Sequence, residues 1–196
     1  MTQRANPTEL AIRDAIVVPL KSFAAAKQRL RRGGALDVSN LVEQLAIGVI
    51  RHCAPRRVIV LCESDDVEAF ARIHHVEVRR TAATGLNEAI QSAHHDLGTE
   101  LDRLIIAHGD LRQPEGLGEV SPAPGVTIVT DHHGRGTNVL VVPTKVDFQF
   151  AFGEDSATAH SREAQRLGLA CHVVTGSPWG FDVDEIADLD TPPNGI

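Results

Sequence analysis

Short apolar runs alternate with amphipathic segments along the first half of the chain. Asp14–Leu20, Arg57–Cys62 and Arg103–Ala107 have the length of strands, and their mainly apolar sequences are typical of strands covered on both faces. Around them, apolar residues recur at helical spacing, which predicts helices over residues 23–31, 38–53, 65–74 and 85–97 and a short strand over 76–79. This alternation predicts an α/β fold with three layers and a mostly parallel sheet.

The second half of the chain is less regular. We predict strands over residues 126–130, 138–142 and 172–175, a helix over 156–167 and a final extended segment over 180–184. A chain of 196 residues is long enough for one compact domain, which at this size buries roughly 70% of the surface exposed on unfolding. We therefore expect residues 1–196 to form a single domain, with loosely ordered tails at about 1–13 and 191–196.

Composition excludes several classes of protein. Hydrophobic residues make up 42% of the chain, and none of its apolar stretches approaches the roughly 20 residues that a membrane-spanning helix requires. The first ten residues lack the apolar core of a signal peptide, so we expect a cytoplasmic protein. The formal charge of -7 and the dispersed basic residues argue against nucleic acid as a partner. An anionic small ligand would need local positive charge or a metal ion.

Cysteine and histidine spacing does not favour zinc or disulfides. Cys53, Cys62 and Cys171 lie far apart in apolar segments, which predicts buried, reduced thiols. Many of the histidines are adjacent pairs, such as His132-His133, whose side chains would point apart on a helix or a strand. We expect most of them to lie on the surface.

A glycine-rich loop is the most informative short sequence. Residues 130–138, Thr-Asp-His-His-Gly-Arg-Gly-Thr-Asn, lie between two predicted strands, and glycine lets backbone amides approach an oxygen-rich ligand closely. The loop is therefore a candidate cradle for phosphate or carboxylate, and a plain hairpin turn is the alternative.

Acidic residues follow two predicted strands. Asp110 comes shortly after the strand Arg103–Ala107, at the edge where open parallel sheets bind ligands, although an Asp there can also simply cap a turn. Asp182 and Asp184 are two apart in an extended segment, so both can point at one ion while Val183 packs on the other side. Magnesium suits such oxygen ligands. The acidic tail around them can equally be solvated charge.

Two further segments could bind anions. Phe152 to Ser156 leads into a predicted helix, where amide groups, Gly153 and the hydroxyl of Ser156 could hold a phosphate or merely cap the helix. His160 lies one turn farther on and could share a face with Ser156. Near the first strand, Lys21 and Lys27 could neutralise a triphosphate or be solvated on the surface.

These segments together resemble one enzyme family. The chain is similar to the phospholactate/phosphoenolpyruvate guanylyltransferases of deazaflavin coenzyme F-420 biosynthesis from about Asp14 to Asp190. The resemblance rests on the order and spacing of Val18 to Lys21, Ala26 to Leu30, Gly85 to Ile90, His108 to Leu111, Gly134 to Asn138, Phe152-Gly153 with Ser156 and His160, and Phe181 to Asp184. One departure is Arg112, which stands where family members usually have Pro.

The resemblance implies a fold of the nucleotide-diphospho-sugar transferase (GT-A) type. It also implies Mg²⁺ held by Asp110, Asp182 and Asp184, with GTP and a phosphorylated three-carbon acid as substrates. By the same likeness Thr137, Gly153 and Ser156 would bind the acid, and the nucleotide side would comprise Lys21, Lys27, Gly85, Leu86 and Asn87. The acid would be phosphoenolpyruvate, 2-phospho-L-lactate or 3-phosphoglycerate, and we favour phosphoenolpyruvate.

Other interpretations stay open at this point. A molybdopterin-type guanylyltransferase would carry a glycine-rich loop after its first strand, and residues 18–27 contain no glycine. A module that binds GTP without turnover is the other alternative. The sequence does not fix the oligomeric state, and a homodimer is possible.

Overall fold

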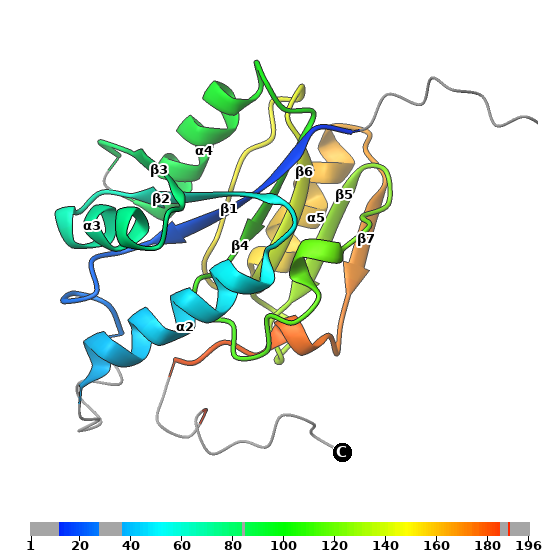
Figure 1. Ribbon diagram of the computed structural model, residues 1–196. Coiled ribbons are helices and arrows are strands. Elements are labelled where there is room, and N and C mark those ends of the chain that lie inside the picture. Colours follow the sequence, from blue (N-terminus) through cyan, green and yellow to red (C-terminus); the bar gives the residue numbers. More distant parts are fainter. Residues whose placement is uncertain (1–11, 28–36, 84, 185–187, 189–196) are drawn as a thin grey trace, which may run out of the picture.

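The computed structural model describes residues 12–27, 37–83, 85–184 and 188, and a seven-stranded sheet runs through its centre (Figure 1). The strand order is β3-β2-β1-β4-β6-β5-β7. In chain order the strands are β1 (Asp14–Leu20), β2 (Arg57–Cys62), β3 (Glu77–Arg80), β4 (Arg103–Ala107), β5 (Val126–Thr130), β6 (Thr137–Pro143) and β7 (Cys171–Val174).

One strand runs against its neighbours. β6 is antiparallel to both β4 and β5, whereas the pairs β3-β2, β2-β1, β1-β4 and β5-β7 are parallel. The prediction of a mostly parallel sheet is confirmed. Because β6 is reversed, its first residues lie beside the last residues of β4, with Val139 opposite Ala107.

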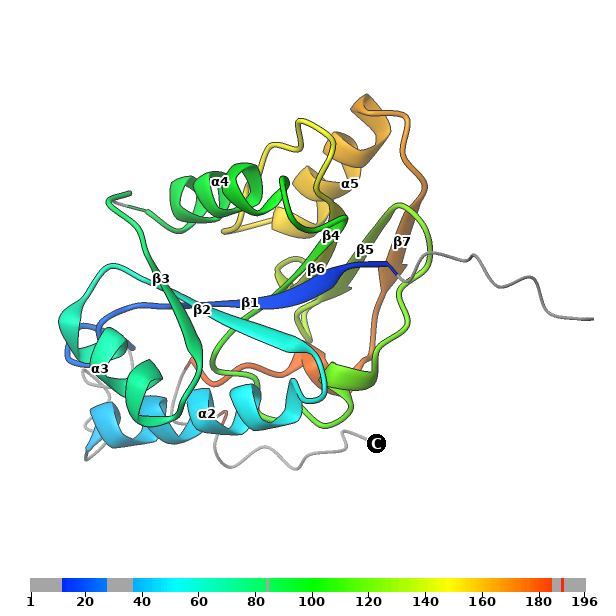
Figure 2. The same cartoon turned by 45° about the horizontal axis from the view of Figure 1, so that its top comes forward.

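Helices cover both faces of the sheet, as Figure 2 shows. One face carries α2 (Val38–His52) and α3 (Asp65–Ile73), and the other carries α4 (Leu86–Leu97) and α5 (Ser156–Arg166). Two short 3-10 helices, η1 (Leu117–Glu119) and η2 (Pro178–Gly180), interrupt the connections. The three predicted layers are present.

The alternation of side chains along β1 separates two hydrophobic cores. Ile16 and Val18 pack with the helices α2 and α3, whereas Ala15 and Val17 pack with α4 and α5. All four are fully buried, which explains why the strand is a continuous apolar run without a polar face.

The predicted helix over residues 23–31 is wrong at its start. Residues 23–26 form turns, and 28–31 lie outside the described residues. The carboxylate of Asp66 accepts hydrogen bonds from the hydroxyl of Ser22 and the N–H of Phe23, each at 2.9 Å, and the ring of Phe23 lies edge-on to Phe70 at 5.0 Å. These contacts with α3 hold a turn where the local pattern favours a helix.

Other expectations were partly met. Arg13 is anchored to Asp102 by hydrogen bonds of 3.0 and 3.2 Å, so the predicted loose tail does not include it, and residues 1–11 and 191–196 lie outside the described residues.

Cys53 and Cys62 are buried free thiols, but Cys171 is exposed because it lies on the edge strand β7. The segment over 180–184 forms one isolated bridge, and its Gly180 closes η2.

Within the described residues, none of the helices combines the length and the apolar character needed to cross a membrane.

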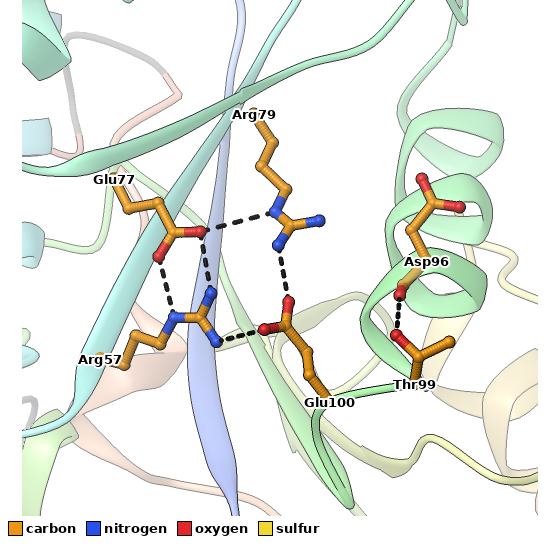
Figure 3. Close-up of polar contacts among 6 residues, drawn as sticks. All are labelled: Arg57, Glu77, Arg79, Asp96, Thr99 and Glu100. Carbon is orange, nitrogen blue, oxygen red and sulfur yellow. Dashed lines mark hydrogen bonds and ion pairs between the residues drawn. The ribbon is translucent and has the colours of Figure 1, made fainter.

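An ion-pair network ties the edge strand β3 to the sheet (Figure 3). Arg57 of β2 donates two hydrogen bonds to Glu77 of β3, at 2.8 and 2.9 Å, and a third to Glu100 at 3.2 Å. Arg79 donates to the other oxygen of Glu100 at 2.6 Å. These side chains are about one third exposed, so solvent weakens the network.

We predict that the core, and not this network, dominates stability. Leu104→Ala should lower the free energy of unfolding by about 2–5 kcal/mol because Leu104 is fully buried on β4. Glu100→Gln should lower it by less than about 1 kcal/mol. Urea unfolding of both variants checks the contrast, and a cost for Glu100→Gln equal to that of Leu104→Ala would contradict it.

Candidate functional site

A short antiparallel pairing brings two predicted carboxylates together. The chain leaves β4 at Ala107, and Leu111 then forms an isolated bridge with Asp182. The N–H of Arg112 donates to the carbonyl of Phe181 at 2.8 Å, and the N–H of Val183 donates to the carbonyl of Asp110 at 3.2 Å. Leu111 and Val183 are buried, so apolar side chains fix both segments, whereas the neighbouring Asp110 and Asp182 are only partly buried.

Three side chains converge at this pairing. Ligand atoms of His108, Asp110 and Asp182 all lie within 4.8 Å of one another. The side-chain amide of Asn138 donates to Asp182 at 3.2 Å and to the carbonyl of Trp179 at 3.1 Å. Burial, and then the charges of Asp110 and Asp184, raise the pKa of Asp182. Negative charge is therefore concentrated here, in a form that a cation would stabilise.

Lys27 already supplies one positive charge to this cluster. Its ammonium contacts Asp110 and lies 2.5 Å from Asp184. Burial alone would lower the pKa of Lys27, but the two carboxylates outweigh it and the pKa is raised. Asp184 thus joins the cluster through Lys27, and its side chain is 50% exposed.

A pocket of about 610 Å³ opens beside the cluster. The predicted site residues in its wall are Lys21, Lys27, Gly85, Leu86, Asp110 and Asp184. His108 also lines it, and the sequence analysis gave that residue no role. The two lysines come from the connection after β1, and Gly85 and Leu86 from the start of α4. Segments far apart in the chain therefore share one cavity.

Asn87, unlike Gly85 and Leu86, is not among the residues that line the pocket. Its amide donates to the carbonyl of Phe152 at 3.1 Å, and its amide oxygen accepts from the N–H of the same residue at 2.6 Å. Asn87 thereby fixes the loop before α5 against α4. Its predicted contact with a nucleotide stays a prediction.

The residues predicted to bind the acid form a buried network. The Thr137 hydroxyl lies 3.2 Å from the Ser156 hydroxyl and 3.1 Å from Nδ1 of His160, and the N–H of Ala151 donates to Nε2 of His160 at 3.1 Å. Thr137, Ser156 and His160 are almost fully buried, and Gly153, with φ of 141°, is exposed nearby. The expected shared face of Ser156 and His160 is present.

Burial and hydrogen bonding set the charge of His160. Burial lowers the pKa of His160 to about 4, so the ring is neutral near pH 7. Because Nε2 accepts a backbone N–H, the remaining ring proton is on Nδ1 and points at Thr137. Thr137 therefore accepts hydrogen bonds, and its own proton is left for another acceptor.

The glycine-rich loop forms the hairpin turn between β5 and β6, and its role as an anion cradle stays a prediction. Asp131 accepts the N–H of Gly134 through its carbonyl at 3.0 Å and the N–H of Arg135 through its carboxylate at 2.8 Å. The carboxylate of Asp131 therefore already accepts a backbone N–H of the loop that could otherwise bind a ligand. The prediction that His132 and His133 point apart is wrong, because their ring centroids lie 3.7 Å apart in this turn.

Sequence comparison decides the family. Residues 14–191 match the family described as guanylyl transferase CofC like. The chain belongs to this family. This guanylyl transferase is 31% identical to a phosphoenolpyruvate guanylyltransferase of Roseiflexus castenholzii over 88% of its own length and 84% of the relative. It is 28% identical to a 3-phospho-D-glycerate guanylyltransferase of Colwellia psychrerythraea over 91% and 90% of the two chains.

Solved structures show the same fold. A protein from Desulfovibrio desulfuricans, assigned as a nucleotide-diphospho-sugar transferase, superposes with a TM-score of 0.72 at 15% identity over 90% of this chain and 84% of that one. A nucleotidyl transferase from Methanothermobacter gives 0.61 at 13% identity over 90% and 94%. These likenesses confirm the predicted GT-A-like fold, and the family match confirms the predicted nucleotidyltransferase class.

The sequence analysis predicted no role for two residues that the structure places in the cluster, Asn138 and His108. Asn138 follows Thr137 in the glycine-rich motif, but only the reversed strand β6 shows that its side chain reaches Asp182. His108 belongs to the segment His108 to Leu111 that carries the resemblance, but no role was predicted for its side chain. Its spacing of two from Asp110 was the available signal.

Substitutions at Arg112 can test the pairing of the two loop segments. Arg112→Pro removes both the N–H bond to Phe181 and the side-chain bond to the carbonyl of Asp188, whereas Arg112→Ala removes only the latter. We expect the proline variant to be less stable than the alanine variant by about 1–2 kcal/mol in urea unfolding. Equal stabilities would show that the backbone bond contributes nothing measurable.

The neutral state of His160 predicts a pH dependence of stability. Between about pH 6.5 and about 4 the unfolded chain binds a proton on this ring and the folded chain does not, so stability falls as the pH falls through this range. In His160→Gln this fall should be smaller by on the order of 3 kcal/mol. Urea unfolding at several pH values measures it. The exposed His172→Gln is the control, and identical slopes in both variants would refute the assignment.

Proposed function

We propose that the enzyme joins the GMP group of GTP to the phosphate of phosphoenolpyruvate and releases pyrophosphate, in the biosynthesis of coenzyme F-420. The relative from Roseiflexus supports this acceptor by its name, and the relative from Colwellia shows that the same family includes enzymes named for 3-phosphoglycerate. 2-Phospho-L-lactate is the third acceptor to be tested. The observation that carries the proposal is the convergence of Asp110 and Asp182 beside the pocket.

The cluster fits a divalent cation. Two carboxylates that repel each other and a histidine nitrogen offer ligand atoms within 4.8 Å of one another. The pKa of Asp182 is raised first by burial and then by the charges of Asp110 and Asp184, and a cation would neutralise those charges. Asp110 and Asp182 would hold Mg²⁺, and Asp184 would join them once Lys27 releases it. When bound, the ion would neutralise phosphate charge and help to align the two substrates.

The pocket has a size that suits the nucleotide, and two lysines lie in its wall. Its volume of about 610 Å³ lies within the usual range for small-molecule sites, roughly 300–1,000 Å³. Lys21 and Lys27 lie in the wall and would offset the charge of a triphosphate. Gly85 and Leu86 open α4, whose first amides would face the same ligand.

The buried network would bind the acid. The Thr137 hydroxyl accepts a hydrogen bond from Nδ1–H of His160, so its own O–H would donate a hydrogen bond to a phosphate or carboxylate oxygen. Gly153 lies in the exposed turn just before Ser156, where an acid can reach it from solvent. Access to Thr137 and Ser156 would require a small movement of this turn, because both are almost fully buried.

The reaction requires positioning more than proton transfer. The phosphate of the acceptor is largely ionised at neutral pH, so the enzyme does not have to remove a proton from the nucleophile. Both substrates are polyanions that repel each other, and catalysis consists mainly of alignment and neutralisation of charge. Lys27 contributes by holding Asp110 and Asp184 in place before substrates arrive.

A pyrophosphate-release assay tests the proposal. We expect release with GTP, Mg²⁺ and phosphoenolpyruvate, and much less with ATP in place of GTP. Asp182→Asn should reduce the rate by about 100-fold or more because it weakens the ion site. Asp96→Asn, on the exposed face of α4, is the matched control and should retain the wild-type rate.

Different acceptors separate the alternatives. Release with 2-phospho-L-lactate or 3-phosphoglycerate alone would correct the acceptor and leave guanylyl transfer intact. Binding of GTP without release with any of the three acids would overturn the proposal and favour a GTP-binding module.

A further inference from the structure

His108 lies in the candidate ion cluster, but the proposed reaction gives it no role as a ligand or as a base. His108 follows β4 directly, and its backbone N–H donates a hydrogen bond to the backbone carbonyl of Asn138 at 3.0 Å. A ring nitrogen of His108 and carboxylate oxygens of Asp110 and Asp182 lie within 4.8 Å of one another. Ligands bound at about 2.1 Å to one ion lie at most about 4.2 Å apart, so small side-chain rotations would suffice to close the group on an ion.

The ring nitrogen Nε2 of His108 is buried and has no hydrogen-bond partner in the described part of the chain. Leaving a buried polar atom unpaired is unfavourable, and such atoms in a folded protein commonly await a water, an ion or a ligand. The other polar atoms near it already have partners: Asn138 bonds to Asp182, and Lys27 bonds to Asp110. The His108 ring also lies against Phe152, with the centroids 5.7 Å apart, so its orientation is restrained.

The third carboxylate is placed differently. Among the described residues, the group within 4.8 Å does not include Asp184, which is half exposed and paired with Lys27. An ion at this cluster would therefore be bound by the carboxylates of Asp110 and Asp182 and by the imidazole of His108, and the carboxylate of Asp184 would not be among its first ligands.

The geometry points to His108 as a direct ligand of the divalent ion, together with Asp110 and Asp182, in a site that binds Mn²⁺ more tightly than Mg²⁺. This inference rests on the metal site of the proposed function and adds a ligand to it. Imidazole nitrogen binds first-row transition metals well, whereas Mg²⁺ prefers oxygen ligands and retains its waters. A mixed nitrogen and oxygen site thus shifts preference toward Mn²⁺.

The test uses the full chain and Mn²⁺ alone, without nucleotide. Titration followed by the electron paramagnetic resonance of free Mn²⁺ gives the affinity, and competition gives the affinity for Mg²⁺. We expect Mn²⁺ to bind at least tenfold more tightly. Electron spin echo spectra of the bound ion should show coupling to a ¹⁴N nucleus of the imidazole.

His108→Phe is the informative variant because it keeps an aromatic ring against Phe152 and removes both nitrogens. We expect it to lose the ¹⁴N coupling and at least tenfold in Mn²⁺ affinity, with Mg²⁺ affinity changed by less than about threefold. His95→Gln, exposed on α4, should match the wild type.

The results separate this inference from the proposed function. Wild-type protein that binds Mn²⁺ without ¹⁴N coupling, or that binds no Mn²⁺, overturns the role of His108 even when pyrophosphate is released. Coupling that disappears in His108→Phe supports it even when none of the acids supports turnover. The wild-type spectrum decides the question if His108→Phe fails to fold.

Discussion

The site depends on one short antiparallel contact between two segments that lie about 70 residues apart in the sequence. Leu111 and Asp182 form a single bridge, flanked by the backbone bonds from Arg112 to Phe181 and from Val183 to Asp110. The segment after η2 belongs to no regular strand, so this bridge and the hydrogen bond from Asn138 of β6 to Asp182 hold Asp182 near Asp110. Two buried side chains, Leu111 and Val183, stabilise the contact against the mutual repulsion of the carboxylates.

That repulsion is balanced within the protein before any ligand binds. The ammonium of Lys27 pairs with Asp110 and Asp184, and the amide of Asn138 donates to Asp182. The two partners come from different places in the fold, because Lys27 lies in the connection after β1 and Asn138 is the second residue of β6. The cluster is thus preorganised, and an incoming cation would compete with Lys27 for the same oxygens.

Local patterns predicted the strands well and the tertiary contacts less well. Asp14–Leu20 and Arg103–Ala107 were predicted at their observed bounds because continuous apolar runs of that length fit few alternatives. The turn after β1 could not be read from periodicity, since Asp66 of another helix holds it. Asp110 and Asp182 were candidates from their places in the predicted elements and from the resemblance, but their proximity follows from a bridge with no sequence signature. His108 and the burial of Thr137 depend on packing between distant elements.

The reversed direction of β6 has a consequence for how two substrates could meet. In a purely parallel sheet, residues at the beginning of a strand lie at the edge opposite to its neighbours' carboxyl ends. Here Thr137 and Asn138 open β6, yet they lie beside the exit of β4. The central strand β4 therefore has the pocket after β1 on one flank and the buried hydroxyl network on the other. In the proposed reaction, donor and acceptor would approach from opposite flanks and would react over the cluster that separates them.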